Sequence, residues 1–140
     1  MNTIQVDIVS AEKEIFSGEA QMVFAPAIMG EVGIAPGHTP LVTKMTPGAV
    51  RVMDVDGNES AFYVSGGLLE VQPNIITVLS DTAERAEDLD EAAVVKAKEE
   101  AEKALHEKDS KIDYAKAQVA LAEAAAQLQT LQRLRKRSGR

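Results

Sequence analysis

The sequence predicts an all-β N-terminal sandwich or flattened barrel of antiparallel strands, followed by a C-terminal antiparallel hairpin of two helices. Apolar and polar residues alternate in short segments over roughly the first 80 residues, as half-buried strands require. Turn-forming residues separate these segments. Beyond residue 81, Gly and Pro are absent until Gly139, while Ala, Glu, Lys and Leu dominate, which favours helix. We therefore expect a β-sandwich over residues 1–84 and a helical hairpin over residues 85–140.

The β-strands are predicted from alternation and from β-branched residues. In the first strand, Ile4, Val6 and Ile8 alternate with Gln5 and Asp7. Further strands are expected at Ala20–Ala25, Glu31–Ala35, Leu41–Met45, Ala49–Val55, Ala61–Ser65, Leu68–Val71 and Ile75–Leu79. Turns are expected at Ser17-Gly18, Pro36-Gly37, Pro47-Gly48, Asp56-Gly57-Asn58, Gly66-Gly67 and Pro73-Asn74. Asp56-Gly57 is the best hairpin signal, because both residues tolerate the positive φ of a tight turn.

Two helices are predicted in the second part. Asp88 or Asp90 is placed to cap the first helix, since a carboxylate there accepts otherwise unpaired backbone N–H groups. That helix is expected to run to about Leu105. The polar segment His106–Ser110 predicts a turn, and a second helix is expected from about Lys111 to Arg135.

A seam rich in alanine is expected between the two helices. The first helix offers Ala93, Ala97, Ala101 and Ala104–Leu105, and the second offers Ala115, Val119, Ala122 and Ala126, with Leu121, Leu128, Leu131 and Leu134 toward a neighbouring face. Alanine buries little area, so this seam gains only a few kcal/mol at about 0.8 kcal/mol per methyl-sized group. Two alternatives remain open: the hairpin opens as a movable arm, or it packs permanently on the sandwich.

Charge and composition limit the classes of function. The net charge is −7, and residues 1–83, 84–110 and 111–140 contribute −7, −5 and +5. So acidic a body argues against nucleic-acid binding. The absence of cysteine excludes a disulfide framework and a thiolate metal site, and it fits a reducing compartment, so we expect the cytoplasm. No segment approaches the roughly 20 apolar residues that span a bilayer, and no secretion signal is recognised.

No catalytic, cofactor or metal site is recognisable in the sequence. Gly-rich phosphate-binding loops and nucleophile motifs are absent, and His38 and His106 belong to no cluster with ligand spacing. His38 falls instead within Gly30–Leu41, where glycine and proline fix the backbone beside Glu31. This segment is expected to be a rigid, presented loop, a typical place for a binding surface. We therefore do not expect an enzyme.

The C-terminal tail is strongly basic. It contains Arg133, Arg135, Lys136, Arg137 and Arg140 and no acidic residue. Cations at a helix C-terminus complement the helix dipole, but two would suffice for that. Five favour contact with a negatively charged partner.

Several motifs together resemble the epsilon-subunit family of bacterial F-type rotary ATP synthases. The segments are Asp7–Glu12, Phe16-Ser17-Gly18, Gly-Glu-Val-Gly-Ile-Ala-Pro-Gly-His-Thr-Pro-Leu-Val-Thr at 30–43, Tyr-Val-Ser-Gly-Gly-Leu-Leu-Glu-Val at 63–71 and Val-Leu-Ser-Asp-Thr-Ala at 78–83. Their order, followed by an alanine-rich helical tail, makes the resemblance specific over essentially the whole chain. It implies a non-catalytic central-stalk subunit of the proton-translocating synthase. Such a subunit is peripheral, at the cytoplasmic face of the bacterial cell membrane, and meets the membrane only through the complex.

The resemblance also implies partners for particular residues. The sandwich would bind the gamma subunit near Ser10 and the c-ring through a loop with Glu31, Gly33 and His38. The helical arm would either lie folded or extend along gamma into the catalytic head. There its basic tip, consisting of Arg133, Arg135, Lys136 and Arg137, would oppose acidic segments of the alpha and beta subunits and inhibit ATP hydrolysis.

One departure from the family concerns nucleotide binding. Some members bind ATP through Ile/Leu-Asp-x-x-Arg-Ala at the start of the first helix, and here Leu89–Val94 reads Leu-Asp-Glu-Ala-Ala-Val. Ala93 replaces the arginine, so a phosphate-facing cation is missing and Asp90 is only a weak nucleotide candidate. Two alternative functions are an ATP-sensing helical hairpin and a free-standing β-sandwich adaptor unrelated to the synthase.

Overall fold

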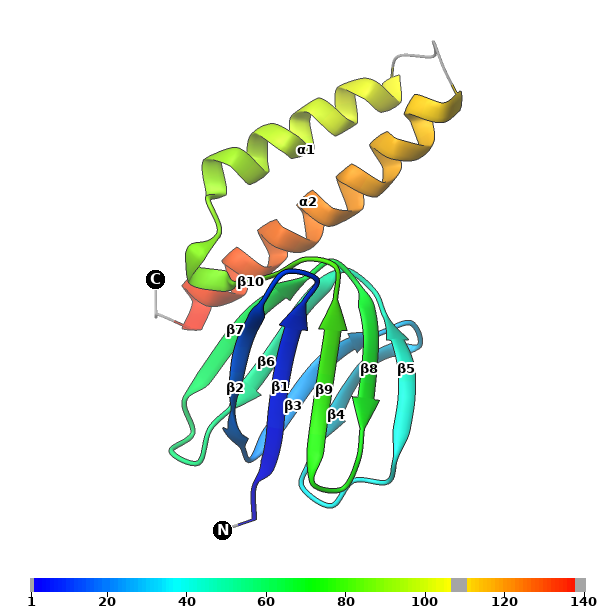
Figure 1. Ribbon diagram of the computed structural model, residues 1–140. Coiled ribbons are helices and arrows are strands. Elements are labelled where there is room, and N and C mark those ends of the chain that lie inside the picture. The colour runs from blue at the N-terminus through cyan, green and yellow to red at the C-terminus, as the bar shows by residue number, and fades with distance from the viewer. Residues whose placement is uncertain (1, 107–110, 138–140) are drawn as a thin grey trace.

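The N-terminal part forms the sandwich that the alternating sequence predicts (Figure 1). The computed structural model describes residues 2–106 and 111–137, with side chains for residues 2–106 and 115–134. The strands are β1 (Ile4–Ser10), β2 (Glu14–Ala20), β3 (Met22–Ala27), β4 (Gly30–Ile34), β5 (Leu41–Met45), β6 (Gly48–Met53), β7 (Glu59–Val64), β8 (Gly67–Val71), β9 (Ile75–Ser80) and β10 (Ala83–Arg85). A short 3-10 helix, η1 (Ala86–Asp88), leads to helices α1 (Glu91–His106) and α2 (Lys111–Arg137). The expected fold class is confirmed.

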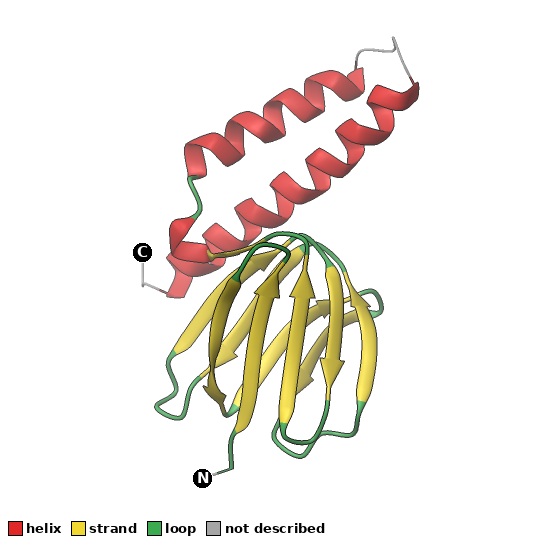
Figure 2. Cartoon of the chain, in the orientation of Figure 1, coloured by secondary structure: helices red, strands yellow, loops and turns green. Residues whose placement is uncertain are grey.

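The strands form one sheet that folds into two layers and nearly closes on itself (Figure 2). Their order is β10-β7-β6-β3-β5-β8-β9-β1-β2, and β4 pairs only with β3 at an edge. One pair departs from the antiparallel expectation, because β1 and β9 run parallel. Each of these two strands also has an antiparallel neighbour, β2 or β8. At the open seam, the Arg85 guanidinium donates a hydrogen bond to the Ile15 carbonyl oxygen at 3.4 Å.

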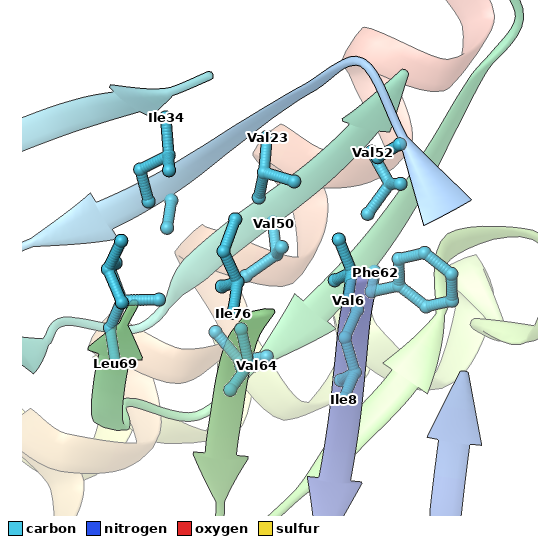
Figure 3. Close-up of a cluster of buried hydrophobic side chains, with 14 of the residues drawn as sticks. Val6, Ile8, Val23, Ile34, Val50, Val52, Phe62, Val64, Leu69 and Ile76 are labelled. Atoms are coloured by element: carbon cyan, nitrogen blue, oxygen red, sulfur yellow. The ribbon is translucent and has the colours of Figure 1, made fainter. Parts of the chain in front are cut away.

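The core lies between the two layers and is built from one side chain in two along each long strand (Figure 3). In β1, for example, Ile4, Val6 and Ile8 are buried while the residues between them are half-buried. Phe62 of β7 is fully buried and packs against Phe16 of β2, with ring centroids 5.2 Å apart. Each fully buried aliphatic or aromatic side chain contributes about 1.5–3 kcal/mol. This core stabilises the sandwich.

Two strands were missed by the sequence prediction. The expected turn at Ser17-Gly18 is wrong, since both residues lie inside β2 and Gly18 pairs with Val6. Cross-strand contacts decide the conformation here: the Ser17 hydroxyl donates to the Asp7 carboxylate at 2.8 Å and accepts from the Gln5 amide at 3.0 Å. Pairing overrides the weak strand preference of glycine. The short β10 also escaped prediction, because three residues are too few to show alternation.

The β6–β7 hairpin forms as expected but with a longer turn. Gly57 adopts φ +85°, and Asp54 and Asn58 close the loop through a 2.9 Å backbone hydrogen bond. Three residues therefore bridge the strands, as in a type I turn followed by glycine in the left-handed region. The Asp54 carboxylate stabilises this form by accepting the N–H groups of Asp56 and Asn58, each at 2.9 Å.

Asp90 caps α1, which settles the choice between the two capping candidates. Its carboxylate accepts the Ala93 N–H at 3.3 Å, and its carbonyl accepts the Val94 N–H at 3.0 Å. Beyond His106, the expected turn lies outside the described residues. α2 then returns along α1 and packs on β6, β7 and η1, so α1 lies on the far side of α2 from the sandwich (Figure 1). Neither described helix combines the length and apolar character needed to cross a bilayer.

The predicted seam between the helices is partly wrong. Ala101 is buried and Leu105 is half-buried as expected, but Ala93, Ala97, Ala115, Val119 and Ala122 are exposed. The burial pattern instead indicates a seam of Val94, Lys98, Ala101 and Leu105 on α1 and Ala117, Leu121, Ala124 and Leu128 on α2, and the expected Ala104 is half-buried beside it. Four residues turn an α-helix by about 400°, so a row spaced only by four drifts off the interface, whereas alternating steps of four and three stay on it.

Gly67 generates a prediction about the stability of the sandwich. Its φ is +124°, and a Cβ there would lie 2.1 Å from the Leu79 carbonyl oxygen, so both conformation and space exclude a side chain. Gly67→Ala should lower the free energy of unfolding, measured with urea, by about 2–4 kcal/mol.

Gly57→Ala is the matched control, because Gly57 also has positive φ but nothing lies within 4 Å of its added Cβ. It should lose only about 1–2 kcal/mol. Equal losses at both positions would show that close packing at Gly67 is unimportant.

Candidate functional site

The candidate surfaces lie on the outer faces of the sandwich, where the other half of each strand's side chains project. Two such faces differ in character. On β3, β4, β6 and β7 the outward residues include charged side chains and the rings of Phe24 and Tyr63, and α2 covers part of this face. On β5, β8 and β9 the outward residues include exposed leucine and valine.

Arg51 organises the first face. Its guanidinium donates to the Glu31 carboxylate at 2.7 Å and to the Glu59 carboxylate at 3.2 Å. It also lies over the Phe24 ring, 4.4 Å from the centroid, where the ring's negative face attracts a cation. We call these four residues the Arg51 cluster. It fixes the orientation of Glu31 at the start of the edge strand β4.

Arg133 of α2 completes this cluster from the arm. Its guanidinium lies 3.7 Å from the second carboxylate oxygen of Glu31. The two side chains are 46% and 41% exposed, and ion pairs so exposed contribute about 0–1 kcal/mol. The structure thus pairs Glu31, which was expected to face the c-ring, with Arg133, which was expected to face the alpha and beta subunits. The side chains of Arg135, Lys136 and Arg137 lie outside the described residues.

Tyr63 lies beneath α2 on the same face. Its neighbours Phe62 and Val64 point into the core, so Tyr63 points outward, yet it is only 1% exposed. Its hydroxyl has no hydrogen-bond partner in the part of the chain that the structure describes. Burial, with smaller contributions from the Glu123 and Glu84 carboxylates, raises the pKa of Tyr63 above its usual value. The phenol therefore stays protonated at physiological pH.

Gly33 and His38 follow Glu31 along the predicted loop, which is only partly a loop. Residues 30–34 form β4, and the turn begins at Ala35. A Cβ at Gly33 would lie 3.1 Å from the Met22 side chain and 3.2 Å from the Phe24 ring, so a side chain there would crowd both. Glu31 and His38 thus lie near opposite ends of β4.

The turn that carries His38 is rigid. Pro36 and Gly37, with φ +81° at Gly37, form a type II turn in which the His38 N–H donates to the Ala35 carbonyl at 3.2 Å. The Gly37 N–H ties it to the Pro73 carbonyl at 3.0 Å. His38 Nδ1 donates to the Thr39 carbonyl oxygen at 2.6 Å, which fixes the ring.

Ser10, assigned to the gamma contact, is 9% exposed and acts within the chain. Its hydroxyl donates to the Lys13 carbonyl at 3.1 Å and accepts the N–H groups of Glu12 and Lys13 at 3.4 and 3.3 Å. It therefore shapes the β1–β2 turn. That turn borders the second face, because Ala11 lines the same hollow as Leu68 and Leu79.

The second face carries exposed apolar residues, which we call the apolar stripe: Leu68, Leu79 and Val42. Leu68 and Leu79 are directly opposed across β8 and β9 and are 38% and 49% exposed. Val42 on β5 is 64% exposed. A hollow of about 550 Å³ opens beside Leu68 and Leu79, between Lys44 and Asp81. Clustered exposed apolar side chains mark interaction surfaces.

Sequence reasoning missed the residues that define both faces. Arg51, Tyr63, Leu68 and Leu79 all occupy outward positions of correctly predicted strands. Alternation was the signal that could have found them, because a large apolar or aromatic residue at an outward position needs a cover. Asp90, the weak nucleotide candidate, serves as the α1 cap, and Ala93 beside it is exposed.

Family models match both parts of the chain. Residues 3–86 match the model described as ATP synthase, Delta/Epsilon chain, beta-sandwich domain. Residues 87–132 match the model described as ATP synthase, Delta/Epsilon chain, long alpha-helix domain. These matches confirm the resemblance found in the sequence motifs.

Known proteins agree with this assignment. The chain is 62% identical over 137 residues to the ATP synthase epsilon chain of Nitrosococcus oceani, covering 98% of each chain. It is 59% identical to that of Alkalilimnicola ehrlichii over 100% of both. Its fold matches a chain of the Euglena gracilis mitochondrial ATP synthase, with a TM-score of 0.85, 20% identity and coverage of 94% of this chain and 82% of that one. The chain belongs to the ATP synthase delta/epsilon chain family.

Proposed function

We propose that this chain is a non-catalytic rotor subunit of a proton-translocating ATP synthase that binds the gamma subunit through the apolar stripe. The observation that carries this is the opposed pair Leu68 and Leu79, which leaves leucine exposed on a face that the helices do not cover. Transferring such side chains from water to an interface stabilises association by roughly 25 cal/mol per Å². Ser10 would contribute to the contact indirectly, because its hydroxyl stabilises the β1–β2 turn beside the hollow.

The relatives support a place in the synthase. They are named ATP synthase epsilon chain and match over nearly the whole chain. A chain of the Tetrahymena thermophila structure described as central stalk/c-ring shares the fold, with a TM-score of 0.58 and 13% identity. Membership of this family removes the unrelated adaptor from the alternatives. The chain would act at the cytoplasmic face of the membrane, peripherally, through the complex.

The second proposed contact is with the c-ring, through Glu31, Gly33 and His38. Edge strand β4 and the rigid turn after it present these residues along one margin of the sandwich. Glu31 already faces two arginines, so any cationic group of the ring would have to share or replace one of them. In this proposal residues 1–84 bind both rotor partners.

The helical part, residues 85–140, is proposed to be a mobile arm that restrains ATP hydrolysis. Its basic tip, formed by Arg133, Arg135, Lys136 and Arg137, would meet acidic segments of the alpha and beta subunits after α2 leaves the sandwich. Only a weak, exposed ion pair holds Arg133 at Glu31. The ATP-sensing alternative is less favoured, because Asp90 is engaged as a cap and Ala93 offers no cation.

Introducing negative charge into the apolar stripe tests the proposed gamma contact. Leu68→Glu with Leu79→Glu places two carboxylates where we propose an apolar interface, and both residues project from the core, so the fold should persist. The apparent affinity for gamma should fall at least about 100-fold, since each buried unpaired charge costs several kcal/mol. The variant should therefore no longer co-purify with gamma.

The control is Val119→Glu, which introduces a carboxylate at an apolar α2 residue that is 60% exposed and lies away from the stripe. It should co-purify normally. Retention of gamma by the stripe variant would refute the proposed interface.

Neutralising the basic tip tests the inhibitory arm. Replacing Arg133, Arg135, Lys136 and Arg137 with Gln should raise the ATPase activity of the assembled enzyme severalfold, as should deletion of residues 88–140, while assembly is retained. Each lost cation removes a charge-assisted contact of about 1.5–3 kcal/mol if it is made in the inhibited state.

A matched variant replaces four other cations with Gln: Lys96, Lys98 and Lys103 on α1 and Lys116 on α2. Its ATPase activity should equal that of the unmodified enzyme. Equal activity of all the variants would exclude inhibition by the tip.

A further inference from the structure

We propose that Tyr63 is a release element for the helical arm: its buried, unpaired hydroxyl weakens the seat of α2 on β6 and β7. The seat is the outer face of these two strands, which α2 contacts. The inference rests on the proposed release of α2 and assigns the residue that sets how readily it occurs. It concerns the chain itself and does not depend on what the arm meets afterwards.

The position of Tyr63 makes α2 responsible for its burial. Tyr63 pairs with Ala49 of β6 and Glu84 of β10, and its ring projects from the side opposite the core. An outward tyrosine in an uncovered sheet would be solvated, yet this one is 1% exposed. Glu123 of α2 lies close enough to act on its pKa. Both α2 and η1 contact β7, and Glu123 identifies α2 as an element that covers the ring.

Covering Tyr63 removes water from its hydroxyl without replacing the lost hydrogen bonds. No donor or acceptor in the described residues pairs with this oxygen. A buried hydroxyl left without a partner disfavours the buried state. When α2 moves away, water reaches the hydroxyl and the penalty disappears. The hydroxyl therefore favours the released arm.

The fully buried contacts that α2 makes in the seat involve small side chains. The buried residues of α2 near its C-terminal end are small: Ala126 and Thr130, with the Thr130 hydroxyl bonded to the Ala126 carbonyl at 2.8 Å. Arg133 adds an exposed ion pair to Glu31. A hollow of about 250 Å³ also remains between α2 and the sandwich, bordered by Gln129, Thr130 and Pro47. Half-buried Leu134 borders another hollow beside Ala61 and Ala86. Because the buried side chains of the seat are small, one unpaired hydroxyl shifts the balance between seated and released α2.

Thiol labelling in the full-length chain measures release directly. The chain has no cysteine, so Ala126→Cys provides a single thiol, 9% exposed while α2 is seated. Its labelling by iodoacetamide under native conditions reports the population in which α2 has left the sandwich. In this background, Tyr63→Phe should slow labelling roughly 5- to 100-fold, the range expected when an unpaired buried hydroxyl is removed.

Two controls make the result specific. Tyr114→Phe removes the only other phenol of the chain, near the start of α2 and far from the sandwich, and should leave labelling unchanged (Figure 1). A separate reporter, Ala83→Cys, is 4% exposed in the core and should be labelled much more slowly, through global unfolding.

Unchanged or faster labelling in Tyr63→Phe would overturn the proposal, because the hydroxyl would then be neutral or stabilising. Equal labelling rates at Ala126→Cys and Ala83→Cys would also overturn it, since α2 would leave only when the sandwich unfolds. ATPase measurements play no part, so failure here is distinguishable from failure of the proposed inhibition.

Discussion

One constraint underlies the whole structure: in each long strand, alternate side chains are buried in a single core and the others lie on the outer surface. Ile8, Phe62 and Ile76 are among the buried side chains that stabilise the sandwich. Their neighbours are free to differ from face to face. Because the sheet nearly closes on itself, the outward residues of β6 and β7 face one way and those of β8 and β9 another, and each face acquires its own chemistry.

The two faces suit different kinds of contact. Glu31 of the Arg51 cluster pairs with Arg133 of α2, and Tyr63 lies beneath α2, so the seat combines an exposed ion pair with small buried side chains. Such contacts can fix the position of α2 on the sandwich but contribute little binding free energy. The apolar stripe has no partner within the described chain and offers leucines to another molecule. The proposed contact with gamma and the proposed release of the arm therefore use different faces of one small domain.

The sequence predicted the platform better than the surfaces, for a physical reason. Alternation reports which residues are buried in the core, so the strands of Val6 and Val78 were found. It does not report what covers an outward residue, so neither the seat at Tyr63 nor the pairing of Glu31 with Arg133 was predicted. The helix seam failed similarly, because helix propensity, which is highest for alanine and lower for valine, does not report whether Ala93 or Val94 faces the other helix. Gly18 was predicted to lie in a turn because the sequence does not show that it pairs with Val6 of β1.

Hydrogen exchange measured by mass spectrometry, on the free chain and on its complex with the gamma subunit, tests most directly whether the two faces are separate. We predict slower exchange in β8 and β9, around Leu68 and Leu79, with exchange in β6 and β7 unaffected by gamma. Protection confined to β6 and β7, with none along β8 and β9, would contradict it.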